Sequence, residues 1–168
     1  MSTKMRVAAY TKLAKLWERC RDSAIDNQLN YYTEKFKDSE NFELIAVYID
    51  ITGQKHIANR PEMVHLLHDC MEGNIDVIAT QTKAYLAANA TEFFYLIKFL
   101  FDLDPPINII TEEEDYGINT ITNTENQREA LQELVNKIVS MAPPEYANWL
   151  ETLLRSMQHL NFAESMER

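Results

Sequence analysis

Short apolar runs alternate with longer amphipathic segments along this chain, and the alternation constrains the fold more than any other sequence feature. The runs are rich in β-branched and aromatic residues and lie at 5–11, 43–50, 75–80 and 107–111. Runs of this kind predict buried β-strands. Because amphipathic segments separate them, we expect an α/β fold with a mainly parallel sheet of four or five strands. Right-handed crossovers would place the ends of strands 5–11 and 75–80 side by side.

The amphipathic segments predict helices at about 23–38, 61–72 and 89–103. The first segment has one apolar face, whose members recur at spacings of three and four residues: Ile25, Leu29, Tyr32 and Phe36. The second begins at Pro61, which suits a first helical turn, and ends at Gly73. These helices would cover the two faces of the predicted sheet.

After Thr120 the pattern becomes purely helical, with segments at 124–141 and 145–162 separated by Pro143-Pro144. One apolar stripe is formed by Leu131, Leu134, Ile138 and Met141, and the other by Trp149, Leu153, Met157 and Leu160. We expect an α/β domain at 1–120 and a helical extension at 121–168 for dimerisation or docking. The first stripe has to be covered, either by a second subunit or by segment 145–162 folding back.

The charge balance bears most directly on function, because the chain has 26 Asp and Glu against 16 Lys and Arg, a formal net charge of −10. Affinity for duplex DNA rests largely on Lys and Arg that neutralise phosphates. We therefore expect weak or no direct DNA binding. Residues 142–168 hold four glutamates and two arginines, a composition that does not suit a recognition-helix module.

Neither the cysteines nor the hydropathy indicates export or a membrane. Cys20 and Cys70 cannot build a disulfide framework, and the N-terminus has no signal-peptide pattern. The apolar stretches fall short of the roughly 18 residues that a membrane-spanning helix needs. We expect a reduced, cytoplasmic protein with no membrane partner.

Five short motifs are spread along the first half of the chain. They are Met5-Arg6-Val7-Ala8-Ala9-Tyr10, Ala24-Ile25-Asp26-Asn27-Gln28, Tyr48-Ile49-Asp50, Asn59-Arg60-Pro61-Glu62-Met63 and Gly73-Asn74-Ile75-Asp76-Val77-Ile78. In this order and at this spacing, residues 5–120 resemble the catalytic domain of the serine recombinases (resolvases, invertases and transposon integrases). The resemblance implies a resolvase-like three-layer fold with a four- to five-stranded, mainly parallel sheet, followed by C-terminal helices.

The same resemblance exposes a degenerate active site. Where the family keeps Arg-Val-Ser after the first strand, this chain has Lys12-Leu13-Ala14, and alanine has no hydroxyl to attack a phosphodiester. Where the family binds the scissile phosphate with two arginines, this chain has Tyr85 and Ala88, and Ala84 takes an acidic or hydroxyl position. In-line attack at phosphorus needs cations that stabilise the developing charge. Catalysis is therefore not expected.

Three family positions are retained, namely Gln28, Asp50 and Arg60. We favour a role in the fold for them, through hydrogen bonds to one another or to the backbone. Residual phosphate binding by Arg60 and by Lys12 is the alternative, although a lysine lacks the planar fork of an arginine.

Other candidate chemistry is weaker. Ser23 is a possible replacement nucleophile, but it has no partner arginines. His65, His68 and Cys70 lie close together on one predicted helix, yet a zinc site usually has four ligands in recognisable pairs, so we expect no metal. No phosphate-binding or dinucleotide-binding glycine motif occurs, so we expect no cofactor. The acidic run 112–115 is typical of a solvated loop.

These observations favour a catalytically inactive, resolvase-like protein that acts through protein contacts. It would regulate or assist a mobile element or prophage, paired with itself or with an active recombinase, and 124–141 is the expected dimer helix. One alternative is an acidic inhibitor that mimics DNA toward a DNA-processing enzyme. Another is a divergent recombinase with a relocated active site.

Overall fold

The computed structural model describes residues 3–167, and the side chains of residues 3–160. Four parallel strands form its central sheet in the order β2-β1-β3-β4. They are β1 (Met5–Leu13), β2 (Phe42–Ile51), β3 (Val77–Thr80) and β4 (Asn108–Thr111). Val7 lies opposite Val77 and Tyr10 opposite Thr80. The parallel sheet and the adjacency of its first and third strands are thus confirmed.

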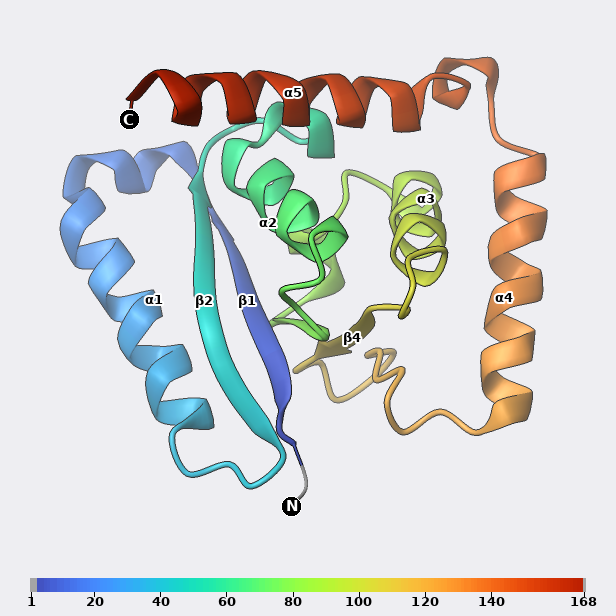
Figure 1. The fold of residues 1–168 in the computed structure, drawn as a ribbon, viewed down its shortest axis with the longest axis horizontal. Coiled ribbons are helices and arrows are strands. Elements are labelled where there is room, and N and C mark those ends of the chain that lie inside the picture. Colours follow the sequence, from blue (N-terminus) through green and yellow to red (C-terminus); the bar gives the residue numbers. More distant parts are fainter. Residues whose placement is uncertain (1–2, 168) are drawn as a thin grey trace.

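Helices cover both faces of this sheet (Figure 1). On one face lies α1 (Arg21–Phe36), and on the other lie α2 (Pro61–Met71) and α3 (Ala90–Phe101). Side chains alternate along β1, so Val7 and Ala9 pack toward Tyr32 and Phe36 of α1, whereas Ala8 and Tyr10 belong to the larger core beneath α2 and α3. The expected three-layer α/β fold is confirmed.

The face of α1 that is buried differs in part from the predicted one. Tyr32 and Phe36 are buried as expected, but Leu29 remains 38% exposed and Ala24 is buried instead. The prediction for Leu29 was wrong.

Three short 3-10 helices follow the strands at their carboxyl ends. They are η1 (Lys15–Cys20) after β1, η2 (Ile57–Asn59) after β2 and η3 (Lys83–Tyr85) after β3. Because parallel strands end at the same edge of a sheet, these turns gather there. Most of the family positions singled out from the sequence lie in or beside them.

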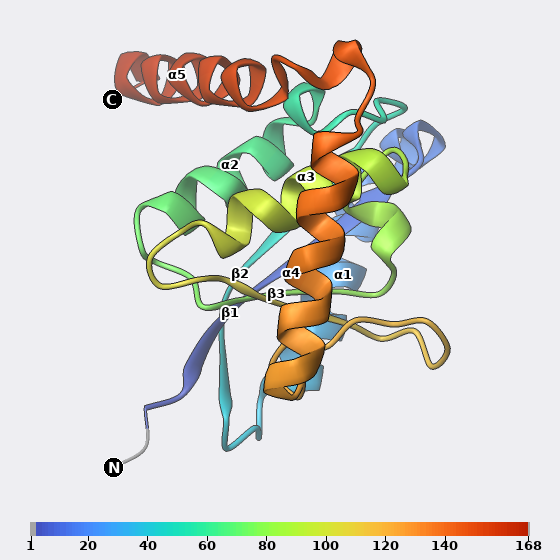
Figure 2. The same ribbon diagram turned by 90° about the vertical axis from the view of Figure 1, so that its right-hand side faces the viewer.

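Two C-terminal helices complete the fold. The first, α4 (Glu125–Ser140), packs against α3, and the second, α5 (Trp149–Glu167), crosses α2 and η2 (Figures 1 and 2). A turn of 3-10 helix, η4 (Pro144–Tyr146), joins them. A capping box at Thr124 starts α4. No helix within residues 3–167 is long and apolar enough to cross a membrane.

The buried stripe of α4 is rotated from the predicted one. Val135 is fully buried with the core, and Leu131 and Val139 pack against it. Leu134 and Met141 are 44% and 71% exposed within the single chain, so segment 145–162 does not fold back over them, and their cover by a second subunit stays a prediction. The valines at 135 and 139 are aligned with Leu131 at helical spacing, which turns that side of α4 toward α3. The division into 1–120 and 121–168 stays a prediction, since Val135 and Leu153 join the core of the α/β part.

The acidic run after β4 is more structured than a solvated loop. Glu112 accepts hydrogen bonds from Tyr31 and Lys35 of α1, and Glu113 accepts one from the Lys83 amide at 2.9 Å. Only Glu114 and Asp115 project into solvent. The prediction therefore holds for half of the run.

Candidate functional site at the carboxyl edge of the sheet

Arg60, one of the retained positions, is fully buried just before α2. Its Nη1 donates hydrogen bonds to the Tyr10 hydroxyl at 2.9 Å and to the Tyr85 carbonyl at 2.6 Å. Its Nη2 donates to the Leu86 carbonyl at 2.6 Å. The guanidinium thus joins β1 to the η3 segment, and its hydrogen-bonding fork points into the protein.

Asp50, at the end of β2, is 4% exposed and holds the start of α2. It accepts hydrogen bonds from the backbone amides of Glu62 and Met63, both at 3.0 Å. A carboxylate at this place satisfies free amides of the first helical turn and suits the helix dipole. Asp50 also accepts the Tyr10 hydroxyl at 2.8 Å.

Tyr10 links these two retained charges. Burial raises the pKa of Tyr10, so the phenol stays protonated, donates to Asp50 and accepts from Arg60. Tyr10 was not among the site residues predicted from the sequence. A signal was present, because a tyrosine facing the core of a central strand needs a hydrogen-bond partner for its hydroxyl.

The other retained and substituted positions are less tightly bound. Gln28 of α1 accepts a hydrogen bond from Thr11 at 3.0 Å. Lys12 is half-buried, and its Nζ lies 3.5 Å from the Thr52 carbonyl. Ala14 is exposed directly after β1. The structure therefore joins Asp50 and Arg60 through Tyr10, while Gln28 and Lys12 bind neighbouring groups.

An apolar groove lies beside the connection between η3 and α3, and Ala84 and Ala88 are among the residues that line it. Its volume is about 530 Å³, and its lining combines small residues of the η3–α3 connection with larger apolar residues of α3 and α4. The main members are Ala84, Ala87, Ala88, Phe93, Phe94, Ile97, Leu131 and Leu134. Lys83 is the charged residue of this lining, and its Nζ donates to the Tyr116 carbonyl. The groove suits apolar side chains better than phosphate.

A second, polar cavity of about 510 Å³ lies between η1 and the turn after β2. Its lining includes Lys15, Glu18, Arg21 and residues 51–54. Arg21 is paired with Glu18 at 2.7 Å. Ser23 is exposed and is not among the lining residues. This cavity therefore gives no support to Ser23 as a relocated nucleophile.

The histidines of α2 are engaged with carboxylates. His65 lies 3.5 Å from Asp69, and His68 lies 3.4 Å from Glu72. Cys70 is buried, and burial raises the pKa of its thiol. Within the part of the chain that the structure describes, no group of three or more His, Cys, Asp or Glu is placed to hold a metal ion.

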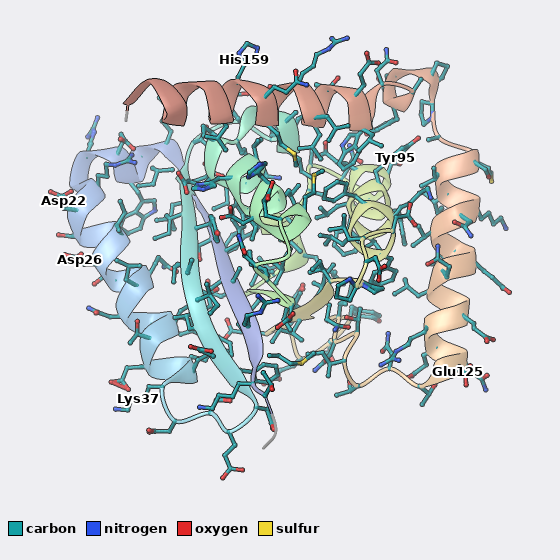
Figure 3. The ribbon with its side chains drawn as sticks, viewed as in Figure 1. Asp22, Asp26, Lys37, Tyr95, Glu125 and His159 are labelled. Carbon is teal, nitrogen blue, oxygen red and sulfur yellow. The ribbon has the colours of Figure 1, made fainter. Side chains whose placement is uncertain are left out.

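Acidic side chains are spread over distant elements. Asp22 and Asp26 project from α1 at one side of the molecule, whereas Glu125 lies at the start of α4 on the opposite side (Figure 3). These three acidic side chains thus lie at two opposite sides of the molecule.

Comparison with known proteins places the fold. No protein-family model and no curated protein sequence matches the chain. The N-terminal catalytic domain of TP901-1 integrase is similar with a TM-score of 0.55 and 22% identity, over 79% of this chain and 92% of that one. A resolvase family site-specific recombinase from Streptococcus pneumoniae gives 0.54 and 14%, over 94% and 99%.

A third similar structure is the C-terminal catalytic domain of ISC1926 TnpA, an IS607-like serine recombinase. Its TM-score is 0.52 at 15% identity, over 96% of this chain and 98% of that domain. The TM-scores show a shared arrangement of the elements, and at identities this low the similarity concerns the fold alone. This chain therefore has the fold of a serine recombinase catalytic domain.

Proposed function

We propose that this protein is a catalytically inactive, serine-recombinase-like factor that acts through protein–protein contacts, as a regulatory or accessory partner in a mobile element or prophage. The proposal is supported by the resemblance of short motifs to the recombinase family and by the shape of the molecule at the site. A nucleophilic hydroxyl is missing at Ala14, and the aligned phosphate-binding positions hold Tyr85 and Ala88.

One observation carries most of the weight. The groove that includes Ala88, one of the two positions compared with the family's arginines, is apolar and alanine-lined. The guanidinium of Arg60 is turned inward onto Tyr10, Tyr85 and Leu86. A scissile phosphate would need the opposite arrangement, with cations facing an open polar surface. An apolar groove of this size instead suits side chains of a protein partner.

The side of α4 beside this groove is the proposed contact surface. Leu134 lines the groove and is 44% exposed, and Met141 follows it at the end of the same helix. A second copy of the chain, or an active recombinase, would cover these side chains. A two-fold symmetric interface needs a protruding side chain and a complementary recess on the same surface. The exposed Leu134 is the protruding side chain, and the neighbouring groove is the recess.

Light scattering on the purified chain at tens of micromolar tests this surface. The expected result is a dimer mass that Leu134→Glu reduces to the monomer mass. Asn136→Glu is the matched control, because it adds the same charge two residues along α4, about 200° around the helix, and should leave the dimer intact.

A monomer mass for the unmodified chain would remove the homodimer and leave a second protein as the partner. Co-purification from the native host, compared between the unmodified chain and Leu134→Glu, then decides. A partner that is lost with Leu134→Glu and kept with Asn136→Glu supports the contact surface. Equal recovery with both variants contradicts it.

A further inference from the structure

A buried carboxylate joins three segments that are distant in the sequence. Glu92, in the first turn of α3, is 2% exposed. It accepts hydrogen bonds from the amide of Ala88 at 3.1 Å, the amide of Ile57 at 3.4 Å and the indole Nε1 of Trp149 at 3.0 Å. A buried charge is costly unless donors satisfy it, so all three donors matter to its stability.

Two of these donors belong to the segments that Arg60 also connects. Ile57 begins η2, which leads directly to Arg60, and Ala88 follows the carbonyls of Tyr85 and Leu86 that Arg60 binds. Segments 57–60 and 84–88 are thus held together twice, by the guanidinium on one side and by the Glu92 carboxylate on the other.

The third donor comes from the C-terminal helix. Trp149 is the first residue of α5, and α5 reaches the same region again through Ser156, whose hydroxyl donates to the Ala58 carbonyl at 3.0 Å. Leu153, between these two polar contacts, is fully buried, and Met157, directly after Ser156, is 4% exposed. The docking of α5 is therefore tied to the position of η2 and, through Glu92, to the Ala88 amide.

We propose that α5, when it is docked, keeps the candidate site at the carboxyl edge of the sheet in its ordered conformation, a role that we call a clasp. Its docking through Trp149 completes the hydrogen bonding of Glu92 and so keeps segments 57–60 and 84–88 ordered. Displacement of α5 loosens both segments, including the alanine-lined wall of the apolar groove. This coupling lies within one chain and does not depend on which partner the protein binds.

Hydrogen exchange on the full-length chain tests the clasp. Trp149→Phe keeps an aromatic ring but removes the indole donor, and Trp17→Phe is the matched control, because Trp17 is 46% exposed on η1. Loss of a hydrogen bond to a charged group should raise the equilibrium constant for local opening, and with it the exchange rate, by about tenfold or more. We expect that acceleration at the Ile57 and Ala88 amides in Trp149→Phe, with Ile109 of β4 unchanged and no effect of Trp17→Phe.

Two results would overturn the proposal. One is unchanged exchange at both amides in Trp149→Phe; the other is an equal acceleration at Ile57, Ala88 and Ile109, which would indicate global destabilisation without local coupling. If Trp149→Phe does not fold, Ser156→Ala takes its place, since it removes the contact of α5 with Ala58 and otherwise only a hydrogen bond to the Thr152 carbonyl within α5. The same pattern of local acceleration is then expected, and its absence contradicts the clasp.

Discussion

Replacement of Arg60 by methionine should destabilise the fold strongly. Methionine keeps much of the side-chain volume but removes all three hydrogen bonds to Tyr10, Tyr85 and Leu86, whose lengths are 2.9, 2.6 and 2.6 Å. The two carbonyls lose a charged donor, and Asp50 loses the positive charge that faces it through the Tyr10 hydroxyl. Breaking one side of a buried charged network typically costs about 3–5 kcal/mol.

We therefore expect Arg60→Met to lower the free energy of unfolding by about 3–5 kcal/mol, measured by urea denaturation followed by circular dichroism. Arg60→Lys should recover only part of this loss, because an ammonium group cannot reproduce the fork that binds both carbonyls. Arg21→Ala is the control: its pair with Glu18 is exposed, and such pairs contribute about 1 kcal/mol or less.

A loss below about 1 kcal/mol for Arg60→Met, comparable with that of an exposed pair, would refute this reasoning. It would mean that the guanidinium is not fixed in the interior and is free to meet a phosphate. A double-mutant cycle with Tyr10→Phe adds a second check, because residues in one network are expected to couple.

Further outcomes follow from other contacts. Ala14→Ser should form no covalent adduct with DNA on a denaturing gel, because a restored hydroxyl still lacks phosphate-binding cations; an adduct would contradict the proposed inactivity. The hydrogen bond from Arg6 lowers the pKa of Asp76, so their pair stabilises the fold above about pH 4 and is lost as the pH falls through the lowered pKa. In Asp76→Asn the free energy of unfolding should depend less on pH in that range, by about 1 kcal/mol or less for a partly exposed pair. An unchanged pH dependence would argue against the pair. Burial raises the pKa of Tyr32 to about 12, so stability should fall between about pH 10 and pH 12, and less so in Tyr32→Phe, as followed by urea midpoints. Thr124→Ala should cost about 1 kcal/mol through loss of the α4 cap, and no change in the urea midpoint would show that the cap is dispensable.

The layered fold was accessible from the sequence because hydrophobic periodicity reports which faces are buried. The runs at 43–50 and 61–72 appear as β2 and α2 with shifts of one residue at most. Periodicity fails where two apolar stripes compete on one helix, as on α4. There Leu134 and Val135 are equally apolar, and only packing against α3 decides that Val135 is buried.

Only part of the candidate site could be predicted from the sequence. The resemblance singled out Asp50 and Arg60 as retained positions that were expected to hydrogen-bond one another or the backbone. It gave no sign that Tyr10 would connect them or that Glu92 would collect donors from three segments. Contacts between residues 35 or more positions apart depend on the path of the whole chain, which local patterns do not encode.

Direct binding of DNA is the measurement that tests the central claim most directly. Fluorescence anisotropy of a labelled duplex, titrated with the protein at physiological salt, should show no binding stronger than the weak non-specific range of about 10⁻⁴ M. The reasons are the net charge of −10 and the inward-facing guanidinium of Arg60. Saturable binding at nanomolar protein that is abolished by Lys12→Ala would contradict this account. It would mean that a DNA phosphate binds at the carboxyl edge of the sheet beside Lys12.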